Sequence, residues 1–358
     1  MSQVYRLLFR GAAALLLVGV AIGQMPVVPS TPIPAKEFPL LHPVVSGGKI
    51  GFIDSSLKLV IPYRFELAGK FSEGLAYVQE KGQCGFVDVN GNVIFAEKRF
   101  CSPGHSDFSE GLAAFEFATN RKGKSYLRHR LRGYLDRTGK IVIPARFFNA
   151  GDFSEGLAAV NERIGDKFGY IDKTGKYVIA PTFDYASDFS EGLAAVTVGH
   201  RCGYINHAGE YVIPAFIEDC GRFSDGLALA GSGIKKIGVI DSSGHYVIPL
   251  QPATTWRQAS EGLIAFFGNL QHGFFDKSGK LIIEASSYNN VGRFSEGLAA
   301  VARDYKWGYI NKKGELVIPL QFDEASDFVD GLAMVAITGQ GLVYIDKSGK
   351  VVWKEAYY

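Results

Sequence analysis

A short motif returns about every 35 residues from residue 49 to the end of the chain, and this period constrains the fold most strongly. Its first glycine stands at positions 51, 85, 133, 169, 203, 238, 273 and 308. A second glycine, between an acidic residue and a leucine, stands at 74, 111, 156, 192, 226, 262, 297 and 331. A fixed period of this length predicts a single repeat body rather than the two domains that 358 residues would suggest.

Each repeat has the pattern of three short β-strands. In one copy, residues 169–172 form a first strand, and Asp172 with Gly175 are residues that reverse the chain into a hairpin. The return strand, 177–179, is followed in most copies directly by proline, which ends a strand because it lacks an N–H donor. Residues 193–196 form the third strand. No segment sustains the 3.6-residue period of a helix, so we expect an all-β protein.

Units this short must bury their faces against neighbouring units. The first unit looks complete, and residues 342–353 look like a half unit that caps the C-terminal end. We therefore expect an open, solenoid-like or superhelical array of about eight and a half repeats. The alternative is an eight-bladed β-propeller, because eight full units are present.

The order Gly-Tyr-Ile-Asp, Gly-Lys, Val-Ile-Pro and Phe-Ser-Glu-Gly-Leu-Ala over residues 49–358 resembles the WG (KWG) repeat family of bacterial proteins. The name-giving tryptophan is kept at Trp307, and the same position elsewhere holds Ile50, Cys84, Arg132, Phe168, Cys202, Ile237 and His272. The resemblance implies a β-repeat scaffold and no established chemistry. We expect a non-enzymatic scaffold for protein or cell-envelope glycan interaction, and the alternative is an enzyme whose site is assembled across repeats.

The N-terminal segment has the features of an export signal. Arg6 and Arg10 precede an apolar run of 11 residues, 12–22, which is shorter than the ~20 residues of a membrane span. Small residues before position 24 predict cleavage after Gly23, and an uncleaved anchor is the alternative. We assign 1–23 to the signal peptide, 24–48 to a proline-rich linker and 49–358 to the repeat domain. Export predicts a periplasmic, cell-surface or secreted protein without a membrane span.

Charge is balanced except in one segment. The chain has 38 basic and 36 acidic residues, and removal of the signal makes the two numbers equal, which argues against a nucleic-acid partner. The insert 118–132 concentrates basic residues: Arg121, Lys122, Lys124, Arg128, Arg130 and Arg132. These residues are candidate contacts for an anionic envelope component or another polyanion. The alternative is a long solvated hairpin.

Four cysteines occupy two pairs of matching repeat positions. Cys84 and Cys202 stand in the tryptophan position, directly before Gly85 and Gly203. Cys101 follows Gly85 by 16 residues, and Cys220 follows Gly203 by 17. In the unit of Trp307, the position that matches Cys220 holds Ala325. A large tryptophan in contact with a small alanine in that unit would thus be replaced by two cysteines in the other two units. This register predicts the disulfides Cys84–Cys101 and Cys202–Cys220, which export permits. Four free buried thiols are the alternative.

The remaining periodic residues have structural interpretations. An Asp or Asn closes the first strand in every copy, and we expect it to bond turn amides rather than calcium. The acidic residue before Gly-Leu is expected to make a repeated turn or capping contact. The aromatic residue after the first glycine is expected in a shared core seam rather than in a glycan-binding ladder. Catalytic and metal-binding spacings are missing from the sequence, so we predict no catalytic residue, metal or cofactor.

Overall fold

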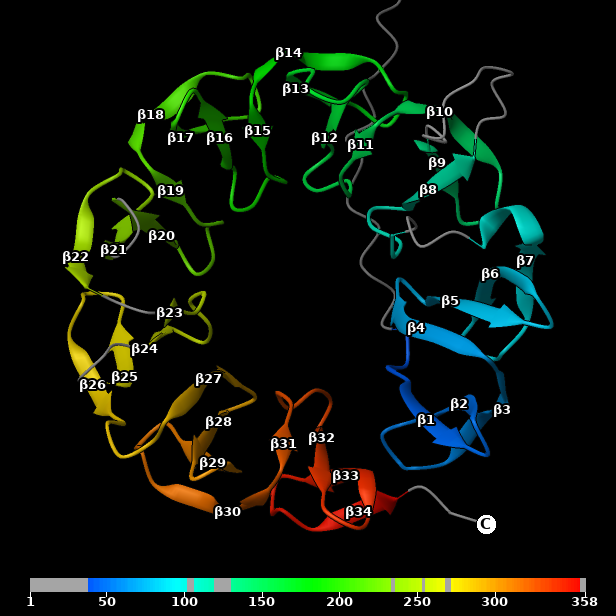
Figure 1. The fold of residues 1–358 in the computed structure, drawn as a ribbon, viewed down its shortest axis with the longest axis vertical. Coiled ribbons are helices and arrows are strands. Elements are labelled where there is room, and N and C mark those ends of the chain that lie inside the picture. Colours follow the sequence, from blue (N-terminus) through cyan, green and yellow to red (C-terminus); the bar gives the residue numbers. More distant parts are fainter. Residues whose placement is uncertain are drawn as a thin grey trace, which may run out of the picture. The chain divides into compact units, whose positions relative to one another are not determined.

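The computed structural model describes residues 38–101, 106–118, 130–232, 236–252, 255–267 and 272–354. They belong to one compact unit, Phe38–Tyr358. The predicted signal peptide, 1–23, and most of the predicted linker lie outside the described residues. The unit consists of nine antiparallel sheets that follow one another in chain order around a ring (Figure 1). The sheets are called blades 1 to 9 below.

The strands are given by blade. Blade 1 holds β1 (His42–Ser46), β2 (Lys49–Ile53) and β3 (Leu59–Phe65); blade 2 holds β4 (Leu67–Ser72), β5 (Leu75–Glu80), β6 (Gln83–Asp88) and β7 (Val93–Glu97), and the short 3-10 helix η1 (Lys98–Phe100) follows. Blade 3 holds β8 (Leu112–Ala118), β9 (Arg130–Asp136) and β10 (Ile141–Phe147); blade 4 holds β11 (Asn149–Ala150), β12 (Ala158–Asn161), β13 (Phe168–Ile171) and β14 (Tyr177–Phe183). Blade 5 holds β15 (Tyr185–Ala186), β16 (Ala194–Val198), β17 (Arg201–Ile205) and β18 (Tyr211–Ile217); blade 6 holds β19 (Asp219–Cys220), β20 (Leu227–Gly231), β21 (Lys236–Asp241) and β22 (Tyr246–Pro252). Blade 7 holds β23 (Thr255–Trp256), β24 (Leu263–Phe267), β25 (His272–Asp276) and β26 (Leu281–Glu284); blade 8 holds β27 (Asn290–Ser295), β28 (Leu298–Arg303), β29 (Lys306–Asn311) and β30 (Leu316–Phe322); blade 9 holds β31 (Glu324–Ala325), β32 (Leu332–Ile337), β33 (Gly341–Asp346) and β34 (Val351–Lys354).

A blade straddles two sequence repeats. In blade 4 the order is β11-β12-β13-β14. The third strand of one repeat, β12, therefore pairs with the first strand of the next repeat, β13, which in turn pairs with β14. Strands such as β14, β18 and β30 lie on the outer circumference (Figure 1). The short strand that precedes the third strand, such as β11, was not predicted. Two residues are too few to show the alternation of apolar and polar residues that indicates a strand. The all-β prediction is confirmed.

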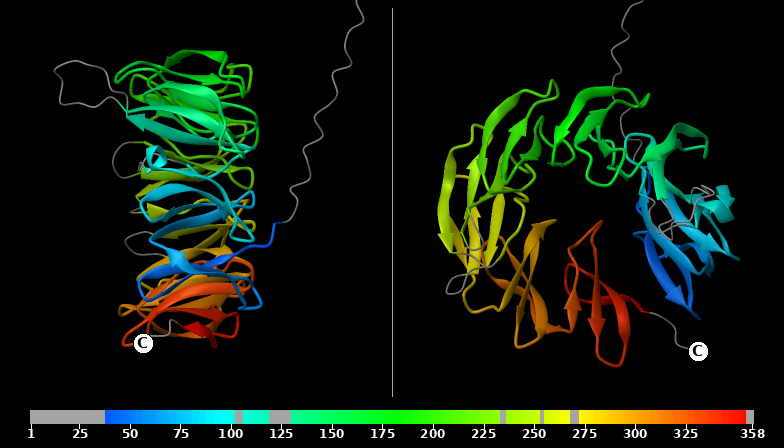
Figure 2. Two further views of the ribbon diagram at one scale, coloured as in Figure 1. Left: turned by 90° about the vertical axis from the view of Figure 1, so that its right-hand side faces the viewer. Right: turned by 45° about the horizontal axis from the view of Figure 1, so that its top comes forward.

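The ring is closed by the two ends of the unit. Val44 and Ile53 of blade 1 form one core cluster with Leu332 and Tyr344 of blade 9. The Tyr344 hydroxyl also donates a hydrogen bond to the Pro43 carbonyl, at 3.0 Å. Figure 2 shows the ring edge-on, with the blades side by side around it. The propeller alternative is therefore confirmed, and the open array is corrected.

The propeller has nine blades rather than the expected eight. The additional blade arises because β1 pairs with β2, with Val44 opposite Gly51, and so completes blade 1. Residues 42–46 were assigned to the proline-rich linker, but they belong to the folded unit, which begins at Phe38. The C-terminal half repeat supplies β33 and β34 of blade 9 and is not an end cap.

The core lies between neighbouring blades. Tyr170 of blade 4 is fully buried and packs against Phe189 of blade 5, with ring centroids 4.9 Å apart. Its hydroxyl donates to the Ser187 carbonyl at 2.8 Å, so the phenol is buried with its polar atom satisfied. The first glycine of this repeat, Gly169, is required because a Cβ there would lie 2.6 Å from the Ile179 carbonyl oxygen. The predicted core seam is confirmed.

Candidate functional site

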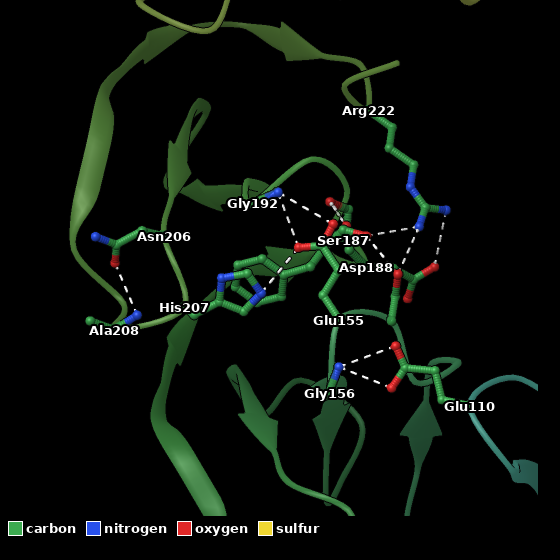
Figure 3. Close-up of polar contacts among 12 residues, drawn as sticks. Glu110, Glu155, Gly156, Ser187, Asp188, Gly192, Asn206, His207, Ala208 and Arg222 are labelled. Atoms are coloured by element: carbon green, nitrogen blue, oxygen red, sulfur yellow. Dashed lines mark hydrogen bonds and ion pairs between the residues drawn. The ribbon is translucent and has the colours of Figure 1, made fainter. Parts of the chain in front are cut away.

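One face of the ring carries the acidic-Gly turns, and we call it the clasp face. Glu155 of blade 4 has a left-handed backbone, with φ of 54°, and its carboxylate accepts the N–H of Gly192 in blade 5 at 3.0 Å (Figure 3). The same contact joins the following pairs: Glu73 and Gly111, Glu110 and Gly156, Glu191 and Gly226, Asp225 and Gly262, Glu261 and Gly297, and Glu296 and Gly331. The repeated acid therefore has the predicted structural role, and the structure shows that its contact joins one blade to the next.

A basic side chain completes most of these clasps. His207 Nε2 lies 3.1 Å from the Glu155 carboxylate, and the imidazole stacks on Phe189 with centroids 4.3 Å apart (Figure 3). Elsewhere the pairs are Lys173 with Glu110, Lys277 with Asp225, Lys312 with Glu261 and Lys347 with Glu296. These ion pairs are half exposed, so each contributes little alone. Their position between blades indicates a structural role rather than a catalytic one.

The Asp and Asn residues that close the first strands form turns on the same face. Asp172 Oδ1 accepts the backbone N–H of Thr174 at 2.9 Å and that of Lys176 at 3.0 Å. The Thr174 hydroxyl also donates to this oxygen, and these bonds hold the pKa of Asp172 below its usual value. The turn interpretation is confirmed. Within the described ranges, no three His, Cys, Asp or Glu side chains are grouped to hold a metal ion.

The opposite face, which we call the hairpin face, carries the connections from the third strand of a repeat to the next first strand. Both predicted disulfides lie near it: Cys84–Cys101, with an S–S distance of 2.04 Å, and Cys202–Cys220, with 2.01 Å. The second one joins β17 of blade 5 to β19 of blade 6. In blades 8 and 9 the residues at the matching positions, Trp307 and Ala325, pack against the same core cluster.

The basic insert enters and leaves on the hairpin face, between β8 and β9. Arg121, Lys122, Lys124 and Arg128 lie outside the described residues. Arg130 begins β9, and Arg132 follows in the same strand. Arg132 lines a hollow between blades 4 and 5.

A hollow of about 660 Å³ lies between blades 4 and 5, and we call it the 4/5 hollow. Phe168 and Tyr185 form an aromatic pair there, with centroids 6.2 Å apart, and Tyr185 is 58% exposed. Arg222 Nη1 lies 3.5 Å from Asp188 Oδ2, and Arg222 Nη2 donates to the Phe189 carbonyl (Figure 3). Burial raises the pKa of Asp188, Arg222 opposes this shift, and the charge of Asp152 adds to it.

Sequence reasoning identified Arg132 but missed Tyr185, Asp188 and Arg222. A signal was present, because the residue before each Phe-Ser-Glu-Gly-type motif changes charge from copy to copy. That position holds Lys70, Asp107, Asp152, Asp188, Arg222, Gln258, Arg293 and Asp327. A variable charged position inside an otherwise regular motif indicates a surface that the fold leaves free to vary.

Nine blades in a closed ring, joined by clasps, define the protein as a β-propeller built from sequence repeats. The family profile described as "WG containing repeat" matches residues 50–84, 133–163, 168–199, 203–230, 273–307 and 307–339, together more than half of the chain. The chain therefore belongs to the WG repeat family, as the resemblance indicated.

The chain is similar in fold to solved structures of low sequence identity. The crystal structure of "the eukaryotic initiation factor" shares 12% identity over 89% of this chain and 96% of that chain, with a TM-score of 0.64. BamB from Moraxella catarrhalis shares 11% identity over 85% and 98%, with a TM-score of 0.48. AztD from Citrobacter koseri shares 14% over 89% and 94%, with a TM-score of 0.42. At such identities the likeness concerns the fold alone.

A search of curated proteins found no match. In the part of the chain that the structure describes, no helix is long and apolar enough to cross a membrane.

Proposed function

We propose that the protein is an exported, non-enzymatic scaffold that binds a protein or envelope glycan in the 4/5 hollow. The observation that carries this proposal is the exposed Tyr185 beside Phe168, Arg132 and the Asp188–Arg222 pair. Ligand sites commonly combine apolar walls with a few polar groups that fix orientation. The hollow has this composition, whereas the clasp face uses its polar groups to join blades.

The lining of the hollow favours binding over catalysis. General acid–base catalysis needs titratable groups whose environments differ. Arg222, which lies against Asp188, cannot act as a general acid or base, because a guanidinium stays protonated in proteins. The ion pair and the aromatic rings are suited to hold a ligand rather than to transform it.

Export is supported by two features. The two disulfides are typical of an oxidising compartment, and residues 1–23 have the pattern of a signal peptide. The polyanion alternative is supported by Arg132, which supplies a guanidinium to the hollow from the edge of the basic insert.

The test is affinity capture from an envelope fraction with the exported protein, tagged at its C-terminus. We expect Tyr185→Ser and Arg132→Ser to lose partners that the unchanged protein retains. Arg201→Ser is the matched control, because Arg201 is half exposed and pairs with Glu218 outside the lining of the hollow. Equal capture by all four proteins, with unchanged thermal melts, would contradict the proposal.

A further inference from the structure

A second hollow, of about 560 Å³, lies between blades 8 and 9, and we call it the 8/9 hollow. Its lining repeats that of the 4/5 hollow position by position. Gly292, Ala300, Trp307, Ala325, Ser326 and Asp327 match Gly151, Ala159, Phe168, Ala186, Ser187 and Asp188. Figure 1 places blades 8 and 9 across the ring from blades 4 and 5. The same small residues and the same aromatic position thus line two hollows in one ring.

Each hollow also contains an ion pair between neighbouring blades. Arg293 Nε lies 2.7 Å from Asp327 Oδ2 in the 8/9 hollow, and Arg222 pairs with Asp188 in the 4/5 hollow. Both arginines keep 42–52% of their side-chain surface exposed. Guanidinium and carboxylate groups held side by side present donors and acceptors together, which suits the vicinal hydroxyls of a sugar ring. The C–H face of that ring suits the aromatic wall.

The linings of the two hollows carry the same surplus of positive charge. The 8/9 hollow is lined by Arg257, Arg293 and one carboxylate, that of Asp327. The 4/5 hollow is lined by Arg132, Arg222 and the carboxylate of Asp188. Arg257 is held in place because its Nε donates to the Val291 carbonyl at 3.0 Å.

We propose that the two hollows bind two stretches of one glycan chain that carries carboxylated sugars. This inference rests on the proposed function and names its ligand class. Arginine binds carboxylate through paired, charge-assisted hydrogen bonds. A polymer with repeating units matches two hollows of repeating composition better than a ligand with a single recognition group does.

The probes are galacturonic acid oligosaccharides of increasing length, with binding measured by calorimetry. Methyl-esterified oligosaccharides of the same length are the matched probe, because esterification removes the charge and keeps the sugar. We expect at least about tenfold weaker binding after esterification, equivalent to the loss of one good charge-assisted contact. We expect chains that span both hollows to bind about 10²-fold or more tightly than short ones, since the second contact becomes intramolecular.

Variants assign the sites. Arg257→Ser in the 8/9 hollow and Arg132→Ser at the 4/5 hollow are each expected to abolish the gain with chain length. Arg201→Ser is expected to bind as the unchanged protein does. Equal losses in all three variants would overturn the inference, because they would reflect general charge alone.

Two further results would also overturn it. Equal binding of esterified chains would exclude carboxylate recognition. Tight binding of poly-glutamate without binding of the glycans would assign the hollows to an acidic peptide instead. If no glycan binds while envelope capture still depends on Tyr185, the ligand class fails and the proposed function stands. If capture is also independent of Tyr185, both fail.

Discussion

The clasp face and the hairpin face of the ring are built from the same repeats, yet they differ in how strictly they repeat. On the clasp face an acid and a glycine are bonded across seven successive blade junctions of the described chain. On the hairpin face, the same pair of repeat positions holds the disulfide Cys202–Cys220 at blades 5 and 6, and Trp307 and Ala325 at blades 8 and 9. Regularity therefore marks groups that every blade junction needs, and variation marks positions where the chemistry is free to change.

The physical reason is the difference in what each face must do. A junction between blades exposes backbone N–H groups at tight turns, and an acidic side chain satisfies one of them at the seven successive junctions from blade 2 to blade 9. The hairpin-face positions also lie at a junction, as Cys202 of blade 5 and Cys220 of blade 6 show, but different pairs of residues can fill them. Both hollows are lined partly by residues at these variable positions, such as Phe168 and Trp307.

The largest effect is expected from the disulfides. Replacing Cys202 and Cys220 by alanine should lower the free energy of unfolding by about 3 kcal/mol. The reason is that the disulfide closes a loop in the unfolded chain and so reduces the conformational entropy of that chain. Thermal unfolding with and without reductant measures the loss. Intact mass should rise by four hydrogens when both disulfides are reduced, and an unchanged mass would exclude them.

A smaller effect is expected on the clasp face. Glu155→Ala removes the acceptor of the Gly192 N–H and should cost about 1 kcal/mol in the free energy of unfolding. Glu155→Gln keeps an acceptor oxygen and should recover most of that loss in urea unfolding. Glu218→Ala is the control, because Glu218 is a partly exposed acid that pairs with Arg201. Equal losses for Glu155→Ala and Glu218→Ala would show that the clasp contributes nothing specific.

The smallest effect is expected from pH. The Thr174 hydroxyl and turn amides lower the folded-state pKa of Asp172, and the Ser278 hydroxyl and turn amides do the same for Asp276. The stability that these acids contribute is complete above the unfolded value of about 3.9 and is lost as pH falls through the lower folded value. Asp172→Asn should therefore shift the acid-unfolding midpoint slightly downward, since Asn206 forms the same turn without titrating. An upward shift would contradict this account.

Much of the local structure was readable from the sequence. The strands, the turns, the buried aromatic residues and the cysteine pairing depend on contacts within a repeat or between adjacent repeats, and each left a periodic signal. Phe168 and Arg132 were noted as departures from the tryptophan position. Tyr185 was missed because it belongs to no shared motif. Asp188 and Arg222 stand at the variable position before the Phe-Ser-Glu-Gly-type motif, and their contact between blades 5 and 6 leaves no periodic signal.

The sequence alone determined that this chain is an all-β repeat protein, because alternating apolar residues and turn-forming Asp and Gly act over a few residues. The tertiary structure decided that the ring closes and that it has nine blades. Closure depends on the angle between blades summed around the ring and on β1, a strand outside the repeat motif that places Val44 against Leu332 and Tyr344 of the last blade. It also decided which charges meet, since Arg257 of blade 7 and Asp327 of blade 9 line one hollow only because blades 7, 8 and 9 pack in succession.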